Sequence, residues 1–375
     1  MFPRKTYEER LGKIVAALDQ SGLDGLLLNR TSNIAYLTGA VNSCSWMFIT
    51  KEGKWVALVM DSDVEVYREE SVVKDIKTFR DHDPFSLFKK VAEELGLTRG
   101  RIGLEFSRPG IFFNTFEILK FSLPPTVQFA NGEMLIEELR AIKSEEEIEY
   151  MKKAARIAEL GMDSAFKAVK PGLSEADLAS EVELTIRRAN GRVPVVNYIA
   201  SGKRTCLAHH APSNKKVENG DVVTLDIHAG YMGYCADLSR TIVCGDSDQA
   251  DKIKQAYADM IKAEEQTIQE CRNGVALKEI KKGFYQRMNE VRGLKFLLGP
   301  VLHGVGIVNH EMPYFQFPHN EKGYPEKLTS NMVLALSNIG LYFPHDWGVR
   351  VEDTILVTDD EPIYLTHFTK ELVHV

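Results

Sequence analysis

The stretch LDIHAGYMGYCAD, residues 225–237, places charged side chains where the sequence otherwise predicts a buried strand. The run before it is apolar and β-branched, and side chains two apart on a strand share a face, so Asp226 and His228 are expected to point the same way. The glycines and aromatic residues at 230–234 suit a tight hairpin that brings Asp237 back alongside them. Buried charge needs a partner, and carboxylates with an imidazole are donors that a divalent metal binds. From this stretch alone, the alternative is an aspartate that caps a turn beside a half-exposed histidine.

The whole chain has the composition of a soluble globular protein, with 375 residues, 44% apolar and 26% charged, and its length favours two domains. A net charge of −7 without a basic block argues against nucleic acid as the main partner. No apolar run approaches the length of a membrane helix, and the polar start MFPRKTYEERLGK lacks a signal-peptide core, so no membrane partner is expected. Five scattered cysteines form no CxxC pair and no even disulfide framework, which favours the cytoplasm.

The pattern of expected secondary structure changes once along the chain. Residues 1–130 alternate expected strands with expected helices, which predicts a layered α/β domain, and residues 131–375 are expected to form the second domain. The expected strands cover 24–30, 46–50 and 54–61, and the expected helices cover 7–22 and 83–96. A long helix is expected to begin after Ser144, because Glu147 three residues on completes a capping box, and to end at 170–172.

Two segments of the second domain echo each other. Residues 171–191 and 273–293 each start at a glycine turn after a long helix, run one amphipathic helix and stop at glycine, and a strand-rich stretch follows each. The echo predicts two similar halves packed around a shared sheet, with a cleft between them. The alternative is a coincidence between two common helix hairpins.

Two further stretches carry histidines and charges among apolar residues. VLHGVGIVNHEMPYF (301–315) holds His303 and His310 seven residues apart, with glycines that let backbone come close to a bound group. WGVRVEDTILVT (347–358) holds Arg350 and Glu352 on one face of an expected strand. The alternatives are a hydrogen-bonded core histidine and a salt-bridged strand, and they weaken once three strands share the pattern.

Order and spacing of these motifs resemble the pita-bread metallopeptidase family, which includes Xaa-Pro dipeptidase (prolidase), aminopeptidase P, methionine aminopeptidase and creatinase. The resemblance also covers SGKRTCLAHHAPS (201–213) and the N-terminal RTSNIAYLTG (30–39), and the latter argues against methionine aminopeptidase. It implies a prolidase-type α/β domain followed by a pita-bread α+β domain with pseudo-two-fold halves. The positions that match the family's metal ligands are Asp226, Asp237, His303 and Glu352, and those that match its substrate-side histidines are His209 and His310.

The resemblance implies hydrolysis of a small peptide or amide by a hydroxide shared between two divalent ions, in a homodimer. His209 and His310 would hydrogen-bond the tetrahedral oxyanion or orient the substrate, and Arg350 would hold the carboxylates. Mixed carboxylate and imidazole donors suit manganese, cobalt, zinc or iron.

The chain departs from the family at two ligand positions. The family's fifth ligand is a glutamate fourteen residues before the last one, and here Ser337 or Asn338 occupies that place. Where the family usually has glycine, this chain has His228. We therefore expect the carboxylates of Asp226, Asp237 and Glu352 to hold one tight metal, and the His303 position to be weak or empty unless His228 is a ligand.

Three functions remain open from the sequence. The first is a prolidase-like metallohydrolase of Xaa-Pro peptides, whether dipeptidase or aminopeptidase, with an altered metal site and weakened activity. The second is a creatinase-like hydrolase of a carbon–nitrogen bond in a small non-peptide amide, with His209 as base. The third is a pita-bread binding protein without catalysis, which the four retained ligands disfavour.

Overall fold

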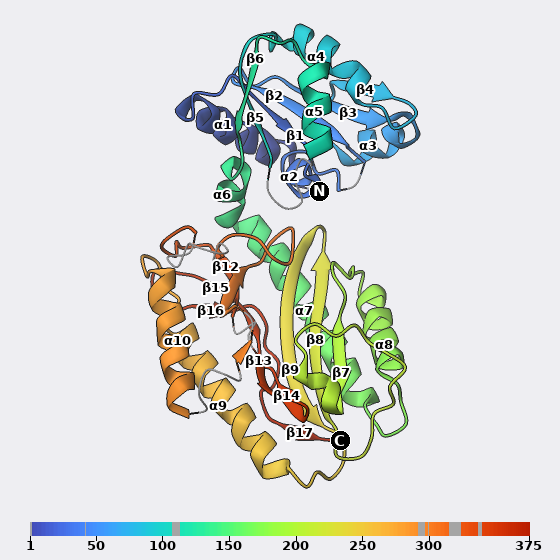
Figure 1. Cartoon of the computed structure of the whole chain (residues 1–375), viewed down its shortest axis with the longest axis vertical. Helices are drawn as coiled ribbons and strands as arrows, with labels where there is room; N and C mark the ends of the chain where they lie inside the picture. The colour runs from blue at the N-terminus through green and yellow to red at the C-terminus, as the bar shows by residue number, and fades with distance from the viewer. Residues whose placement is uncertain are drawn as a thin grey trace. The chain divides into compact units, whose positions relative to one another are not determined.

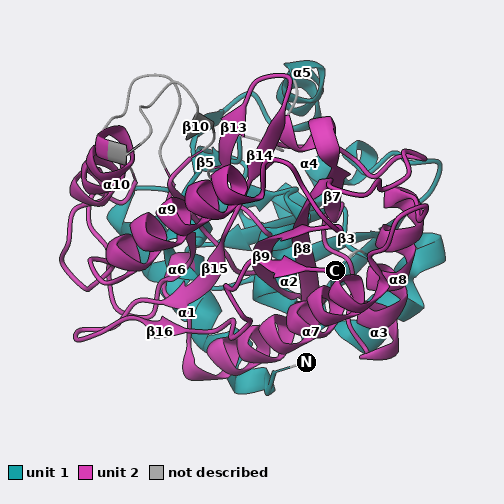
Figure 2. Cartoon of the chain, turned by 90° about the horizontal axis from the view of Figure 1, so that it is seen from below, with its two compact units in different colours: residues 1–140 teal, residues 141–375 magenta. Residues whose placement is uncertain are grey.

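The computed structural model describes residues 2–41, 43–106, 113–291, 297–298, 300–314, 324–336 and 340–375. They form two compact units, residues 1–140 and 141–375 (Figure 2). The first unit extends past the boundary expected at residue 130, because α6 (Leu135–Ala141) is bonded to it. Glu137 of α6 pairs with Arg30, and Arg140 donates to Asn33 Oδ1 over 2.6 Å.

The first unit is a layered α/β domain around one six-stranded sheet, in the order β4-β3-β2-β1-β5-β6. The expected strands and helices are confirmed, although the helix expected at 83–96 starts later, after a 3-10 turn at Phe85–Leu87. The strands are β1 (Gly25–Leu28), β2 (Trp46–Thr50), β3 (Trp55–Met60), β4 (Ile76–Phe79), β5 (Gly100–Leu104) and β6 (Val127–Asn131). The helices are α1 (Arg4–Gln20), α2 (Thr31–Thr38), α3 (Val64–Glu70), α4 (Phe88–Leu95) and α5 (Phe113–Ser122).

The second unit opens with two helices, α7 (Glu145–Ala168) and α8 (Glu175–Arg188), that pack beside each other. The capping box expected at Ser144 and Glu147 is present and begins α7. Helix α7 lies against β8 (Val222–Tyr231) and β9 (Tyr234–Val243), as Figure 1 shows. These strands belong to a four-stranded sheet with β7 (Tyr198–Ser201) and β17 (Val373–His374).

Strands β8 and β9 form the hairpin expected from the opening stretch. Its turn, Met232-Gly233, has positive φ at both residues, 47° and 95°, as a tight two-residue hairpin requires. The register places His228 opposite Asp237. Leu225, Ile227 and Leu238 point into the apolar core that includes α7, so the alternating residues are directed to the opposite face. That face carries the charged side chains.

The second half of this unit repeats the helix pair with α9 (Ala250–Ile268) and α10 (Leu277–Val291). The expectation of one shared sheet is wrong, because the described strands fall into three sheets. An antiparallel bridge between Ser239 and Glu352 joins β9 to the later strands without merging the sheets. Those strands are β10 (Leu297–Leu298), β11 (Leu302–Gly304), β12 (Val333–Leu336), β13 (Gly340–Phe343), β14 (Trp347–Val349), β15 (Asp353–Leu356) and β16 (Ile363–Tyr364).

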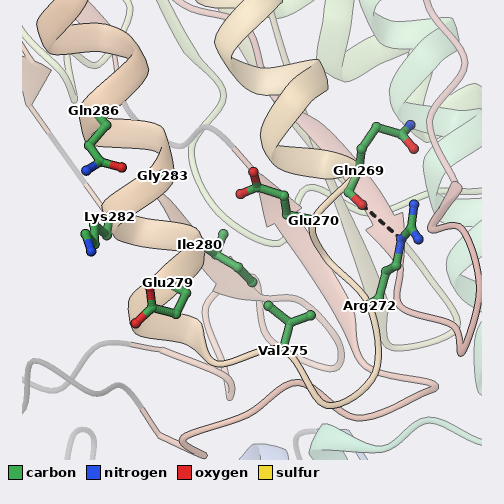
Figure 3. A pocket seen from close by; sticks show the side chains of 9 residues that line it. All are labelled: Gln269, Glu270, Arg272, Val275, Glu279, Ile280, Lys282, Gly283 and Gln286. Atoms are coloured by element: carbon green, nitrogen blue, oxygen red, sulfur yellow. Dashed lines mark hydrogen bonds between the residues drawn. The ribbon is translucent and has the colours of Figure 1, made fainter.

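A surface pocket of about 450 Å³ lies where α9 ends and α10 begins (Figure 3). Charged side chains such as Glu270, Arg272 and Lys282 line it, and it includes none of the site residues expected from the sequence. Within the described ranges, no helix combines the length and the apolar character needed to cross a bilayer.

Candidate metal centre

Five of the expected metal-binding residues come together as two groups of three in the second unit. Asp226, His228 and Asp237 form the first group, and Asp237, His303 and Glu352 form the second; within each, the potential ligand atoms lie within 4.8 Å of one another. Asp237 belongs to both groups. A cation held by either group would therefore have the Asp237 carboxylate within reach.

The first group is built on the β8–β9 hairpin. His228 Nε2 lies 3.4 Å from Asp237 Oδ1 and 3.6 Å from Asp226 Oδ1, so the imidazole points between the two aspartates. All three residues are buried, His228 to 2% exposure. The backbone N–H of His228 donates to Asn197 Oδ1 over 2.7 Å, which fixes the strand at this point.

The second group joins β11 and the segment before β15 to the hairpin. His303 Nε2 lies 3.7 Å from Asp237 Oδ2 and 3.7 Å from Glu352 Oε1. His303 Nδ1 lies 3.0 Å from the carbonyl oxygen of Gly304, which makes Nδ1 the protonated nitrogen and leaves the Nε2 lone pair for a ligand. Burial lowers the pKa of His303 to about 4, so the ring is neutral at pH 7. By these distances, Glu352 belongs with His303 to the second group, and not with Asp226 to the first.

Among the residues that the structure describes, Asp237 Oδ1, His303 Nε2 and Glu352 Oε1 are buried without a hydrogen-bond partner, and so is the outer ring nitrogen of His228, Nδ1. Buried polar atoms are nearly always hydrogen-bonded or bound to an ion, and the first three converge from three different segments. Carboxylate oxygens with imidazole nitrogen are the donors of divalent transition metals, so the residues present fit a cation.

Arg350 is the cationic partner of the centre. Its Nη1 lies 2.7 Å from Asp226 Oδ2 and its Nη2 lies 3.4 Å from Glu352 Oε2. Burial alone would raise the pKa of Asp226, but the charges of Arg350 and His228 bring it down to about 2. Burial and the neighbouring aspartates raise the pKa of Glu352 well above its usual range. Three carboxylates and one guanidinium leave two negative charges when all are ionised, which one divalent cation balances.

Replacing Arg350 with methionine is expected to lower the stability of the metal-free protein by roughly 3–5 kcal/mol, because it leaves two buried carboxylates without their partner. A bound cation supplies positive charge at the same carboxylates, so saturating Mn²⁺ should restore part of the loss. Urea unfolding with chelator and with Mn²⁺ measures both effects. Arg4→Met, which breaks an exposed ion pair with Glu8, is the control and should leave the midpoint unchanged. Equal midpoints for Arg350→Met and the parent in chelator would contradict this reading.

The two histidines expected on the substrate side pack on aromatic rings at or next to the centre. His310 keeps exposed surface, but its ring stacks on His303 with 3.8 Å between ring centroids, and the partial burial there and the His303 ring lower its pKa to about 4. His209 is also exposed; its ring packs 5.2 Å from that of Tyr198, which in turn packs 5.8 Å from His228. Burial on its inner side, then Arg350, lower the pKa of His209. His310 thus contacts the centre directly at His303, and His209 approaches it through the Tyr198 ring.

Several residues of the centre were not expected from the sequence. The Ser239 hydroxyl lies 2.8 Å from Asp226 Oδ1 and 3.0 Å from Glu352 Oε2, so it can donate to either carboxylate. Asn309 Nδ2 donates to Asp237 Oδ2 over 2.9 Å. Ser239 could have been found by alternation, since it is two residues after Asp237 on one strand face. Asn309 lies in a loop with no periodic signal.

The glycines of the HGVG run lie close to another segment of the chain. A side chain at Gly304 would meet the carbonyl oxygen of Met312, and one at Gly306 would meet the Glu311 carboxylate. Both positions therefore require glycine for the packing of this segment alone. Ser337 and Asn338, where the family glutamate is expected, lie outside the described residues.

Comparison with known proteins gives two family matches along the chain. A family described as metallopeptidase family M24 matches residues 149–359, and the creatinase/prolidase N-terminal domain matches residues 10–142. The Xaa-Pro dipeptidase of Pyrococcus horikoshii is 29% identical over 369 residues, covering 97% of this chain and 99% of that protein.

Solved structures agree with these matches over the full length. The Xaa-Pro dipeptidase of Bacillus anthracis is 25% identical with a TM-score of 0.86, covering 98% of this chain and 100% of that one. A prolidase from Thermococcus sibiricus is 27% identical with a TM-score of 0.87, covering 98% and 99%. The likeness thus extends over both units.

Proposed function

Since the chain belongs to metallopeptidase family M24, with a creatinase/prolidase N-terminal domain, we propose that it hydrolyses Xaa-Pro peptides at a metal centre of altered composition. The observation that carries the proposal is the pair of buried ligand groups that share Asp237. Two relatives that align over nearly the whole chain are Xaa-Pro dipeptidases from Pyrococcus species, which supports this substrate class. The pita-bread resemblance stated from the motifs is confirmed by the family match.

A divalent cation supplies Lewis acidity and an acidified water at such a centre. The chain's own residues then bind and orient the peptide. His310 and His209 lie beside the centre, where neutral imidazoles can donate a hydrogen bond to a carbonyl oxygen that gains negative charge. Arg350 holds Asp226 and Glu352 in place from behind.

We propose one tight divalent cation per chain, of manganese, cobalt, zinc or iron, with a second that is weak or absent. The net charge of the centre supports this, because one divalent cation balances the three carboxylates and Arg350. His228 points at both aspartates and is the ligand we assign to the first group. The homodimer implied by the family resemblance belongs to the same proposal.

Peptidase activity on Xaa-Pro substrates is expected to be at least tenfold below that of a relative with the complete ligand set. A general base contributes roughly 10²–10⁴-fold, and we expect the smaller part of that to be lost because His310 and His209 remain. The measurement is metal content of the purified protein, followed by kcat/KM for a panel of Xaa-Pro dipeptides and tripeptides with each metal. The Pyrococcus horikoshii Xaa-Pro dipeptidase is the reference.

The panel separates the alternatives. Bound metal with turnover of a small non-peptide amide, and none of the peptides, would support the creatinase-like hydrolase and overturn the peptidase. Turnover as fast as the reference would show that the family glutamate is not needed as base. Metal without any hydrolysis would favour a binding protein.

A further inference from the structure

Asn309 reaches the carboxylate that both ligand groups share. Its Nδ2 donates to Asp237 Oδ2 over 2.9 Å, and that oxygen is the one that faces His303 Nε2 at 3.7 Å. Asn309 therefore stands on the His303 side of the centre. This is the side that the sequence leaves without the family's glutamate.

The other end of the Asn309 amide is buried and unpaired. The residue is 6% exposed, and its Oδ1 has no hydrogen-bond partner within the part of the chain that the structure describes. Exchanging the two amide atoms would place oxygen against the carboxylate oxygen of Asp237, two acceptors in contact, so the contact itself requires Nδ2 at this position. A buried amide oxygen without a hydrogen-bond partner can be satisfied by a cation, for which it is a suitable donor.

The loop that carries Asn309 is held at its base. Gly304 and Glu311 exchange backbone hydrogen bonds of 3.1 and 2.9 Å, and Cys235 of β9 donates its N–H to Gly306 O over 2.7 Å. The buried Lys143 pairs with Glu311 Oε1 at 3.0 Å. These contacts tie the loop to the strand that bears Asp237, so the amide is presented at a defined place.

We propose that Asn309 is part of the metal centre: its NH₂ group orients Asp237, and its amide oxygen is a neutral donor to the cation held by Asp237, His303 and Glu352. The inference rests on the metal centre of the proposed function and is independent of peptide hydrolysis. A neutral donor adds a ligand without adding charge to a site that one divalent cation already balances. Because cation affinity rises with the charge of the ligands, the position keeps its ion more weakly than a carboxylate would.

The test measures the affinity of the metal-free protein for Mn²⁺ and Co²⁺ by competition with a chelator, for the parent, Asn309→Leu and Asn309→Asp. Asn309→Leu removes both contacts and should weaken binding about 10–100-fold. Asn309→Asp loses the NH₂ contact with Asp237 but keeps an oxygen donor and adds charge, so it should bind the cation more tightly than Asn309→Leu does. If it is as weak as the leucine variant, the amide oxygen is not a ligand and the proposal fails.

Two backgrounds locate the effect. In His303→Ala, Asn309→Leu should cause no further loss, because the position it serves is already gone, whereas in His228→Gly it should keep its full effect. An equal loss in both backgrounds would overturn the assignment to the His303 side. So would an affinity of Asn309→Leu within about twofold of the parent.

The matched control is Asn273→Leu, which removes a surface hydrogen bond from asparagine to Asp359 Oδ1 (2.6 Å) and should leave cation affinity unchanged. Thermal unfolding in chelator reports any loss of folding separately for each variant. If the parent binds none of the metals, the metal centre and this inference both fall. If the parent binds metal and Asn309→Leu weakens it but no Xaa-Pro peptide is cleaved, only the peptidase proposal falls.

Discussion

Replacing Asp237 with asparagine will give a folded protein that holds no divalent cation tightly. Asp237 belongs to both ligand groups, so one substitution takes a charged donor from each. We expect kcat/KM on Xaa-Pro peptides to fall at least about 10³-fold, since a metal supplies several kcal/mol of transition-state stabilisation and each 1.4 kcal/mol is a factor of ten. Metal analysis after desalting and steady-state hydrolysis measure the two losses.

Without metal, Asp237→Asn should be at least as stable as the parent, although it loses activity. Burial raises the pKa of Asp237, because its charge is unfavourable inside the protein, and the neutral amide removes that charge. The unfolding temperature of Asp237→Asn in chelator should therefore equal or exceed that of the parent. In saturating Mn²⁺ the parent should gain stability by ligand binding and the variant should not. Asp163→Asn, on the surface of α7 beside Lys167, is the control for both measurements. One full equivalent of tightly bound metal in Asp237→Asn would refute the shared-carboxylate centre.

Replacing His228 with glycine, the residue usual in the family, should lower metal occupancy and weaken the first cation position by more than about 100-fold. The imidazole is one of three donors there, and loss of a residue that merely supports a ligand already costs about 10–100-fold. The remaining donors are oxygen only, so the preference should move from zinc or iron toward manganese. Competition titrations with Zn²⁺ and Mn²⁺ on metal-free protein measure the affinity and the preference.

Introducing the family's glutamate, by Ser337→Glu or Asn338→Glu, should raise the metal occupancy. Glutamate at Ser337 or Asn338 adds the carboxylate that the family has, and one of the two should increase the number of ions held per chain. For His228→Gly, the matched control is His82→Gly, since His82 is exposed and has φ of 56°, a conformation that glycine adopts freely. Two fully occupied positions in the parent, with His228 turned away from both, would end this account of the centre.

The first ligand group could be predicted from sequence because its geometry is local. Alternation along β8 and a two-residue turn determine that Asp226, His228 and Asp237 share a face, and the hairpin has this register. The residues of the second group could be identified from the sequence, but their positions relative to one another could not be predicted. The bridge between Ser239 and Glu352 joins residues more than one hundred positions apart, and no periodicity in either strand encodes it.

The misplaced details have the same origin. We expected Glu352 to share one metal position with Asp226, whereas its potential ligand atoms group with those of Asp237 and His303, and Asp226 groups with His228. The first unit exceeds its expected end because α6 is bonded to Arg30 and Asn33, residues far back in the chain. Side-chain partners that come from irregular loops, such as Asn309, carry no sequence signal short of the fold itself.

The β8–β9 hairpin also shapes how such a centre can evolve. One face of it packs into the core with α7 and the other carries the metal-binding side chains. A single inserted or deleted residue would exchange the faces, burying carboxylates in the apolar core and presenting leucines to the site. Single-residue insertions and deletions in this hairpin are therefore expected to disrupt the fold, whereas point substitutions on the outer face are not. A single substitution on the outer face, such as histidine at position 228, can thus change the side chains around Asp226 and Asp237 while the packing against α7 is kept.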